Sequence, residues 1–293
     1  MINKIKRVEK IKGTARSGVV VFDHAKVDTS HCLTDGLFRP LSKKPSKESL
    51  NVKHKYKGFT INWINYCRLS IKDQSVFLAV LRIASEKARI NCVDDAEESK
   101  TMAEVREALK LEKDAAKGYC VVINTSLCEI AKAIGLTDGG ANLKMIKRSL
   151  IKLSCVSLII YKGDDIADAF YKTNLISELA GVDGDLHIGI NPMLGKALAG
   201  GQFTHVSMAE QRALTSDVSK RMHVWLASWM RDGHSRKIEL DKLVPHVWGE
   251  DSTYAQLRKR RLTMRSAIAE LNNLGTLKIS EIDKYIIVEK VPQ

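Results

Sequence analysis

One order of elements occurs twice in this chain of 293 residues: helix, tight turn, helix and β-hairpin. In the first copy, apolar spacing and turn residues predict helices at 126–134 and 142–153, a turn at 138–140, and strands at 155–161 and 166–171. In the second copy they predict helices at 216–231, 240–247 and 253–274, then a hairpin over 277–288. This order is typical of a winged helix-turn-helix. The chain is therefore predicted to be an α+β protein, mainly helical, with tandem winged-helix domains.

The rest of the chain divides around these two copies. Residues 1–58 are polar, basic and weakly periodic, which predicts a partly flexible N-terminal segment, although the stretch 31–39 is less polar and could dock. Residues 59–200 are then the N-terminal winged-helix domain and residues 201–293 the C-terminal one. Further elements are predicted as helices at 70–88, capped by Ser70 and Asp73, at 101–116 and at 192–198, and as a strand at 186–190.

The charge of the chain favours a polyanionic partner. A net charge of +13 and a pI near 9.4 indicate DNA, RNA or an anionic membrane surface. No apolar run approaches the roughly 18 residues of a membrane span, and the N-terminus lacks the apolar core of a secretory signal. The six cysteines are scattered, without a C-x-x-C pair or zinc-finger spacing, which favours reduced thiols in a cytosolic protein.

The helix predicted at 253–274 has the features of a recognition helix. Arg258, Arg261 and Arg265 share one face, beside an apolar stripe that can be buried. Arginine can bond two acceptors of guanine in the major groove, although a charge run alone more often indicates a solvated face. Base contacts are predicted for Arg258, Arg261, Arg265, Asn142 and Lys144. Phosphate contacts are predicted for Lys147, Arg148, Lys162, Lys259, Arg260 and Lys284, and the helix start at Thr253 and Tyr254 completes the predicted DNA-binding set.

The motifs that could indicate catalysis or cofactor binding are incomplete. The stretch 189–196 has five residues between its glycines where a phosphate loop has four, and Ala197 stands where Ser or Thr should follow. Asp183-Gly-Asp185 lies between strand-like runs, so a hairpin turn is favoured over a metal site. No His-x-His pair and no serine nucleophile signature occurs. Trp225 and Trp229 are predicted to be core residues. We therefore predict no enzyme activity, no metal and no cofactor.

Four stretches, in order along the chain, resemble a known family: His31-Cys-Leu-Thr-Asp-Gly-Leu-Phe-Arg39, Gly200-Gly-Gln-Phe-Thr-His-Val-Ser-Met208, Glu210-Gln-Arg-Ala-Leu214, and Val247-Trp248 with Arg258-Lys-Arg-Arg261. They resemble the RepC-type iteron-binding replication initiators of IncQ-like broad-host-range plasmids. The resemblance implies two winged-helix domains that bind directly repeated iterons as double-stranded origin DNA. It also implies origin opening, a plasmid-encoded helicase and primase as partners, and a place in the bacterial cytoplasm with the plasmid or nucleoid.

Two alternatives stay open at this point. A winged-helix transcriptional regulator would bind a palindromic operator as a homodimer, whereas an initiator binds direct repeats. A replication enzyme such as a relaxase or primase would need a metal-carboxylate or His-x-His site, which the sequence does not provide. The iteron sequence, the contact with the helicase and the oligomeric state, a homodimer included, do not follow from the sequence.

Overall fold

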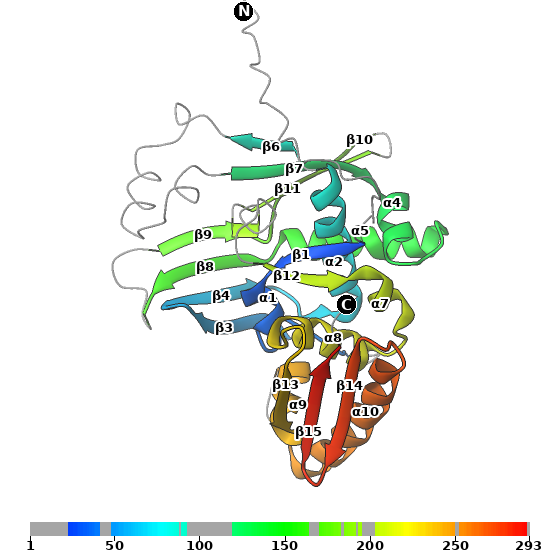
Figure 1. The fold of residues 1–293 in the computed structure, drawn as a ribbon. Coiled ribbons are helices and arrows are strands. Elements are labelled where there is room, and N and C mark those ends of the chain that lie inside the picture. The colour runs from blue at the N-terminus through cyan, green and yellow to red at the C-terminus, as the bar shows by residue number, and fades with distance from the viewer. Residues whose placement is uncertain are drawn as a thin grey trace, which may run out of the picture.

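A computed structural model of the chain describes residues 23–41, 48–87, 89–92, 119–163, 170–182, 185–191, 193–194, 203–249 and 252–291. These residues form an N-terminal and a C-terminal unit, which meet at helix α8 (Asp217–Trp229) (Figure 1). The fold is mixed α and β. Strands are almost as extensive as helices among the described residues, so the predicted mainly helical character underestimated the sheets.

The N-terminal unit contains most of the strands. Its elements are β1 (His24–Asp28), α1 (Thr29–Leu33), β2 (Phe38–Arg39), β3 (Leu50–Tyr56), β4 (Phe59–Asn65), β5 (Leu69–Ser70), α2 (Ile71–Lys87), β6 (Arg89–Cys92), β7 (Tyr119–Ser126), α4 (Leu127–Ala133), α5 (Gly140–Ser154), β8 (Ser157–Lys162), β9 (Phe170–Asn174), β10 (Ile176–Val182), β11 (Asp185–Ile190), β12 (Phe203–Ser207) and α7 (Met208–Ala213). Two four-stranded sheets have the orders β3-β4-β8-β9 and β10-β11-β7-β6, and two pairs, β1-β12 and β2-β5, complete the unit.

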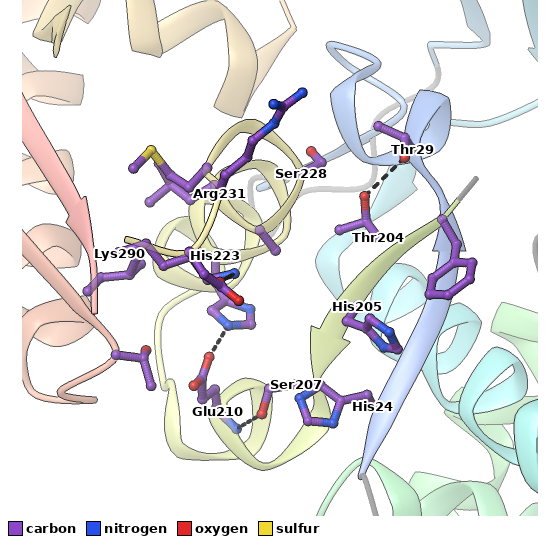
Figure 2. Close-up of a pocket in the computed structure, with 17 residues that line it drawn as sticks. His24, Thr29, Thr204, His205, Ser207, Glu210, His223, Ser228, Arg231 and Lys290 are labelled. Atoms are coloured by element: carbon purple, nitrogen blue, oxygen red, sulfur yellow. Dashed lines mark hydrogen bonds and ion pairs between the residues drawn. The ribbon is translucent and has the colours of Figure 1, made fainter. Parts of the chain in front are cut away.

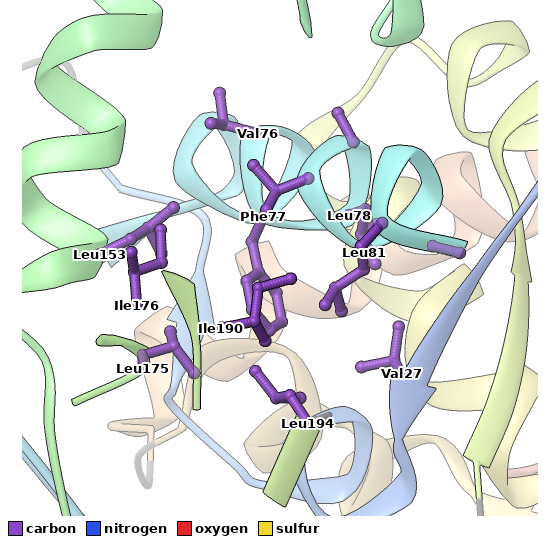
Figure 3. Packing of buried hydrophobic residues seen from close by; sticks show 14 of the residues in the cluster. Val27, Val76, Phe77, Leu78, Leu81, Leu153, Leu175, Ile176, Ile190 and Leu194 are labelled. Carbon is purple, nitrogen blue, oxygen red and sulfur yellow. The ribbon is translucent and has the colours of Figure 1, made fainter. Parts of the chain in front are cut away.

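Helix α2 is the centre of the N-terminal core. It begins as predicted, because Ser70 N donates to Asp73 Oδ2 at 2.8 Å and Asp73 N donates to Ser70 Oγ at 3.3 Å. Its apolar residues are buried around most of the helix, and Figure 3 shows Phe77 pointing toward Ile190. Each such buried side chain contributes roughly 1.5–3 kcal/mol to stability, so α2 is the frame on which the other helices pack.

The described part of the first 58 residues is folded, which corrects the prediction of a partly flexible segment but agrees with the expectation that residues 31–39 dock. Residues 1–22 and 42–47 lie outside the described residues, but β1, α1 and β2 are part of the N-terminal core, with Val27, Leu37 and Phe38 buried. Little in the sequence indicates β1, because this strand pairs with β12, from Asp28 opposite Phe203 to His24 opposite Ser207. A strand of five residues whose partner lies that far along the chain has almost no local periodic signal.

The C-terminal unit follows the predicted order and adds one strand. After α8 come β13 (Ser235–Glu239), α9 (Leu240–Trp248), α10 (Tyr254–Asn272), β14 (Leu277–Ile282) and β15 (Tyr285–Lys290). The sheet has the order β13-β15-β14 and is antiparallel throughout, so β13, which the sequence did not predict, pairs with the second strand of the hairpin. Gly275 ends the helical region with φ +76°, as its position predicted.

Two separate apolar clusters hold the units. The C-terminal cluster includes Met264, Ile268 and Leu271 of α10, and the N-terminal cluster includes Val206 of β12. The predicted division between residues 200 and 201 therefore falls before a strand that packs with the first unit, and the clusters meet on α8. Trp225 is buried, as predicted, and stacks on half-buried Trp229 with ring centroids 4.9 Å apart.

The other predicted elements agree with the structure where it describes them. Strands β10 and β11 pair from Val182 opposite Asp185, which confirms the hairpin interpretation of that stretch. The first helix pair is α4, with Ser126 at its N-cap, and α5, which starts two residues earlier than predicted because Gly139 is its N-cap. The helix predicted at 101–116 lies outside the described residues, as does most of the helix predicted at 192–198.

Candidate nucleic-acid interface

The N-terminal half of α10, which we call the projecting half, is less buried than the C-terminal half. Thr253 caps the helix: its hydroxyl accepts from Gln256 N at 3.4 Å, and its own N–H donates to Gln256 Oε1 at 2.9 Å. The fully buried residues of α10 begin only at Met264. The preceding turns are exposed or half-buried, and of their residues Leu257 packs against the core. A helix whose first turns keep an exposed face is suited to enter a groove.

Two cations on this projecting half are available to a ligand. Arg258 and Lys259 are exposed, and within the described part of the chain neither side chain forms an ion pair or hydrogen bond. Tyr254, one turn before Arg258, has 83% of its surface exposed, and Leu262, one turn after it, has 62% exposed. These positions, spaced by four residues, form one exposed stripe along the helix. Leu262 is not among the residues predicted from the sequence, although a leucine outside the buried stripe is an available signal.

The other two predicted base-reading arginines are already engaged. Arg261 makes two hydrogen bonds to Asp241 of α9, Nε to Oδ1 at 2.7 Å and Nη2 to Oδ2 at 2.5 Å. Arg265 makes an equivalent pair with Glu281 of β14, at 2.9 and 2.7 Å. The hydrogen bonds from these arginines lower the pKa of the Asp241 and Glu281 carboxyls below their usual values. In this geometry the two side chains brace α10 against α9 and the hairpin.

The remaining predicted residues of this unit also have local contacts. The guanidinium carbon of Arg260 lies 5.1 Å from the centroid of the Trp248 ring, and its Nη1 donates to Ser252 Oγ at 2.5 Å. Lys284, in the turn of the hairpin, forms an ion pair of 3.1 Å with Glu239. Both cations stay near the surface, so they add to the positive charge around the projecting half of α10.

The second predicted group lies on α5 in the N-terminal unit. Lys144, Lys147 and Arg148 are exposed, and the opposite face of the helix is buried through Ile146, Leu150 and Leu153. A hydrogen bond of 2.6 Å from Ser149 Oγ to Asp73 Oδ1 holds α5 against α2. The carboxylate of Asp73 is thus both the cap partner at the start of α2 and an anchor for the basic helix.

The two other residues predicted in the N-terminal unit, Asn142 and Lys162, have different surroundings. The amide of Asn142 donates to Thr137 O at 3.0 Å and Thr137 Oγ1 at 3.1 Å, so it closes the turn between α4 and α5. Lys162 is exposed at the end of β8, next to residues outside the described part. The structure therefore brings most of the predicted residues together in two groups, one around α10 and one on α5, on different units, whereas Lys162 lies at the end of β8 that is distant from α5.

No group of three or more His, Cys, Asp or Glu side chains within the described ranges could hold a metal ion. None of the helices among these residues is long and apolar enough to cross a membrane. What the described surface provides at α10 and α5 is a set of cationic donors.

Comparison with known proteins places the chain. A family model described as "Replication protein C (RepC)" matches residues 20–289. The chain belongs to this replication protein family. The match confirms the resemblance to RepC-type initiators that the motifs at 31–39 and 200–214 indicated, and it includes both units, α5 and α10. A search of curated protein sequences gave no match.

Solved structures show a related fold. A crystal structure of domains 2 and 3 of RctB has 10% sequence identity and a TM-score of 0.55, and the match covers 90% of this chain and 99% of that one. A second structure of RctB domains 2-3 has 11% identity and a TM-score of 0.53, covering 87% of this chain and 95% of the other. At such low identity the likeness concerns the fold alone. It extends across both units of this RepC family member.

Proposed function

We propose that this protein is a plasmid replication initiator that binds directly repeated iterons of the origin as sequence-specific double-stranded DNA. The observation that carries the proposal is the projecting half of α10, with Arg258 and Lys259 exposed beside Tyr254. Membership of a replication protein family supports a role at an origin. Origin opening, followed by a plasmid-encoded helicase and primase in the cytoplasm, is the further course that the family implies.

We assign a winged helix to the C-terminal unit. Its order of helix, strand, two helices and a hairpin, with sheet order β13-β15-β14, is the arrangement in which the second of the paired helices, α10, enters the major groove. In this proposal Arg258 contacts a base, while Lys259, Arg260 and Lys284 contact phosphates. Arg261 and Arg265 can contact DNA only if their ion pairs with Asp241 and Glu281 break.

The N-terminal unit supplies the second contact through α5. It also has a helix pair followed by a hairpin, α4, α5, β8 and β9, but β7 pairs with β6 and β11 instead of extending the hairpin sheet. In Figure 1, α5 and α10 lie toward the same side of the molecule. One duplex that passes along that side can therefore meet both helices, with Lys147 and Arg148 placed for phosphates and Lys144 for a base edge.

A footprint of the full chain on the DNA that flanks its own gene tests the proposal. We expect protected segments in direct repeats of equal length, with protection lost in Arg258→Ala and kept in Lys53→Ala. Lys53 is a matched control because it is an exposed cation on β3, in a sheet of the other unit. A single palindromic footprint would instead indicate a transcriptional regulator. Absence of any specific protection would overturn the proposal.

A further inference from the structure

A fully buried arginine joins the two units. Arg221 lies on α8 with an exposed fraction of 0%. Its three guanidinium nitrogens donate to backbone carbonyls: Nε to His246 O at 3.1 Å, Nη1 to Cys32 O at 3.0 Å and Nη2 to Thr34 O at 2.9 Å. Cys32 and Thr34 belong to the N-terminal unit and His246 to the C-terminal unit. Burial of a guanidinium group without hydrogen-bond acceptors destabilises the fold. Arg221 keeps all three acceptors only while both units stay in place.

Three further contacts lie around this arginine. His246 Nδ1 and Asp35 Oδ1 are 2.7 Å apart, and the His246 ring stacks on Trp225 with centroids 4.4 Å apart. Gly36 and Gly249 have φ values of +74° and +71°, and their backbones touch: a Cβ built on Gly249 would lie 2.1 Å from Gly36 Cα. We call these contacts, with Arg221, the joint. It permits little displacement of one unit against the other.

On another side of α8 the units are not packed together. A cavity of about 610 Å³ lies between them (Figure 2). Thr204 and His205 of β12 line it from the N-terminal unit, while Lys290 of β15 lines it from the C-terminal unit. A hydrogen bond between His223 of α8 and Glu210 of α7 crosses one part of the wall. The cavity leaves room for the units to rotate about α8 if the joint is released.

We propose that the joint fixes α5 relative to α10, so that Arg221 is a positioning residue that sets the spacing of the two DNA segments the protein accepts. The proposal rests on the proposed function, in which α5 and α10 contact one duplex. The same face of B-DNA returns about every 10.5 base pairs. Two contact helices in one rigid body therefore accept one spacing, whereas the same helices on a hinge accept several. Arg221 itself touches no DNA.

The first experiment measures the joint without DNA. Spin labels on Cys128 of α4, which is exposed, and on the exposed wing position Ser280→Cys report the distance between the units, with the other accessible cysteines replaced by serine. We expect one narrow distance distribution in the parent protein. Arg221→Met should broaden it about twofold or more, since domains without a fixed interface rotate about hinges. An unchanged distribution would show that the joint does not hold the units.

A second variant tests the joint independently, so that the inference stays testable if Arg221→Met does not fold. Gly249→Ala places a methyl group against Gly36 and should open the joint from its edge. Gly275→Ala is the matched control, because Gly275 has φ +76° and no atom within 4 Å of the position that a Cβ would take. Both variants have the same backbone strain, so broadening in Gly249→Ala but not in Gly275→Ala isolates the joint. Equal behaviour of the two would count against it.

The second experiment measures spacing on DNA. Duplexes carry the two halves of a footprinted site with 0, 5 or 10 inserted base pairs. For the parent protein, 5 inserted base pairs should weaken binding about 100-fold or more, because the second contact is lost. In Arg221→Met the same insertion should cost less than about tenfold, with weaker binding to the native spacing. If the parent protein tolerates the insertion of 5 base pairs, the inference is wrong. If it binds no duplex at all, the proposed function is wrong, and the spin-label experiment still tests the joint.

Discussion

Replacing the cations of α10 one at a time separates base contacts from structural braces. Arg258 is exposed, and its side chain has no polar partner among the described residues that a substitution would disturb. A lost bidentate contact to guanine costs about 1–3 kcal/mol, or roughly 5- to 150-fold in affinity. Arg258→Ala should therefore weaken binding to the footprinted site by that factor and binding to a scrambled duplex by much less. The free energy of unfolding should stay within about 0.5 kcal/mol of the parent value.

Arg261 gives the contrast. Its side chain is 36% exposed and that of Asp241 is 43% exposed, so their ion pair is a surface pair of small net strength. To contact DNA, Arg261 must first leave Asp241. Arg261→Ala should therefore weaken site binding less than Arg258→Ala does. Asp241→Asn releases the arginine and removes a negative charge near the DNA, so it should strengthen binding, by up to about fivefold.

Fluorescence anisotropy at fixed salt, with labelled site and scrambled duplexes of equal length, measures both affinities for each variant. Lys53→Ala is the control for loss of one positive charge far from α10. Equal losses on both duplexes in Arg258→Ala would reassign that residue to a phosphate. If Arg261→Ala is the more damaging variant while Asp241→Asn has no effect, the inference that the ion pair restrains Arg261 is wrong.

Three further predictions concern charge and stability. The double variant Lys147→Ala and Arg148→Ala should weaken binding to every duplex. It should also reduce the slope of log affinity against log salt concentration by roughly 0.9 per lost phosphate contact. The control double variant, Lys53→Ala with Lys55→Ala, should not change that slope in the same titration. Glu270 is partly buried, which alone would raise its pKa, but hydrogen bonds from Ser219, Thr215 and Ser216 lower that pKa to about 2. Its carboxylate therefore stabilises the fold above the unfolded pKa near 4.5, and this contribution is lost as the pH falls through about 2. Glu270→Gln should lower the midpoint of unfolding in urea at pH 7 but hardly at pH 2. An equal loss at both pH values would contradict the assignment. Leu271→Ala should cost about 2–5 kcal/mol of unfolding free energy by leaving a cavity, while Leu262→Ala, on the exposed stripe, should leave the urea midpoint almost unchanged.

Much of the C-terminal unit could be predicted from the sequence because its signals are local. The capping residues Thr253 and Gln256, the apolar spacing of α10 and the stop at Gly275 all lie within one stretch of chain. Strand β13 could not be predicted, because its stretch from Ser235 to Glu239 contains a single apolar side chain, Ile238, and is largely exposed. A short edge strand of this kind is specified by its partner β15, which lies much later in the chain.

The candidate site was predictable in kind but not in detail. Sequence spacing placed Arg258, Arg261 and Arg265 on one face of a helix, and all three lie in α10. It could not distinguish them, because Asp241 and Glu281, which engage two of the three, come from α9 and β14. For the same reason Asn142 looked like a base-reading amide, whereas its nearest acceptors belong to the turn just before it. Which cations remain available to DNA is decided by tertiary partners.

The repeated order of elements did not predict how the two units are connected, because both units share helix α8. Periodicity assigned α8 to the second copy, since Met222, Trp225 and Leu226 face the C-terminal core. Yet Val224 of the same helix faces the first core, so α8 is a wall of both. One residue of the helix carried the missing information: a charged side chain, Arg221, directly before the buried Met222. An arginine at such a position must find acceptors inside the protein, and on a helix shared by two cores those acceptors come from both. A charge in an apolar helix thus points to a neighbour that the local pattern does not include.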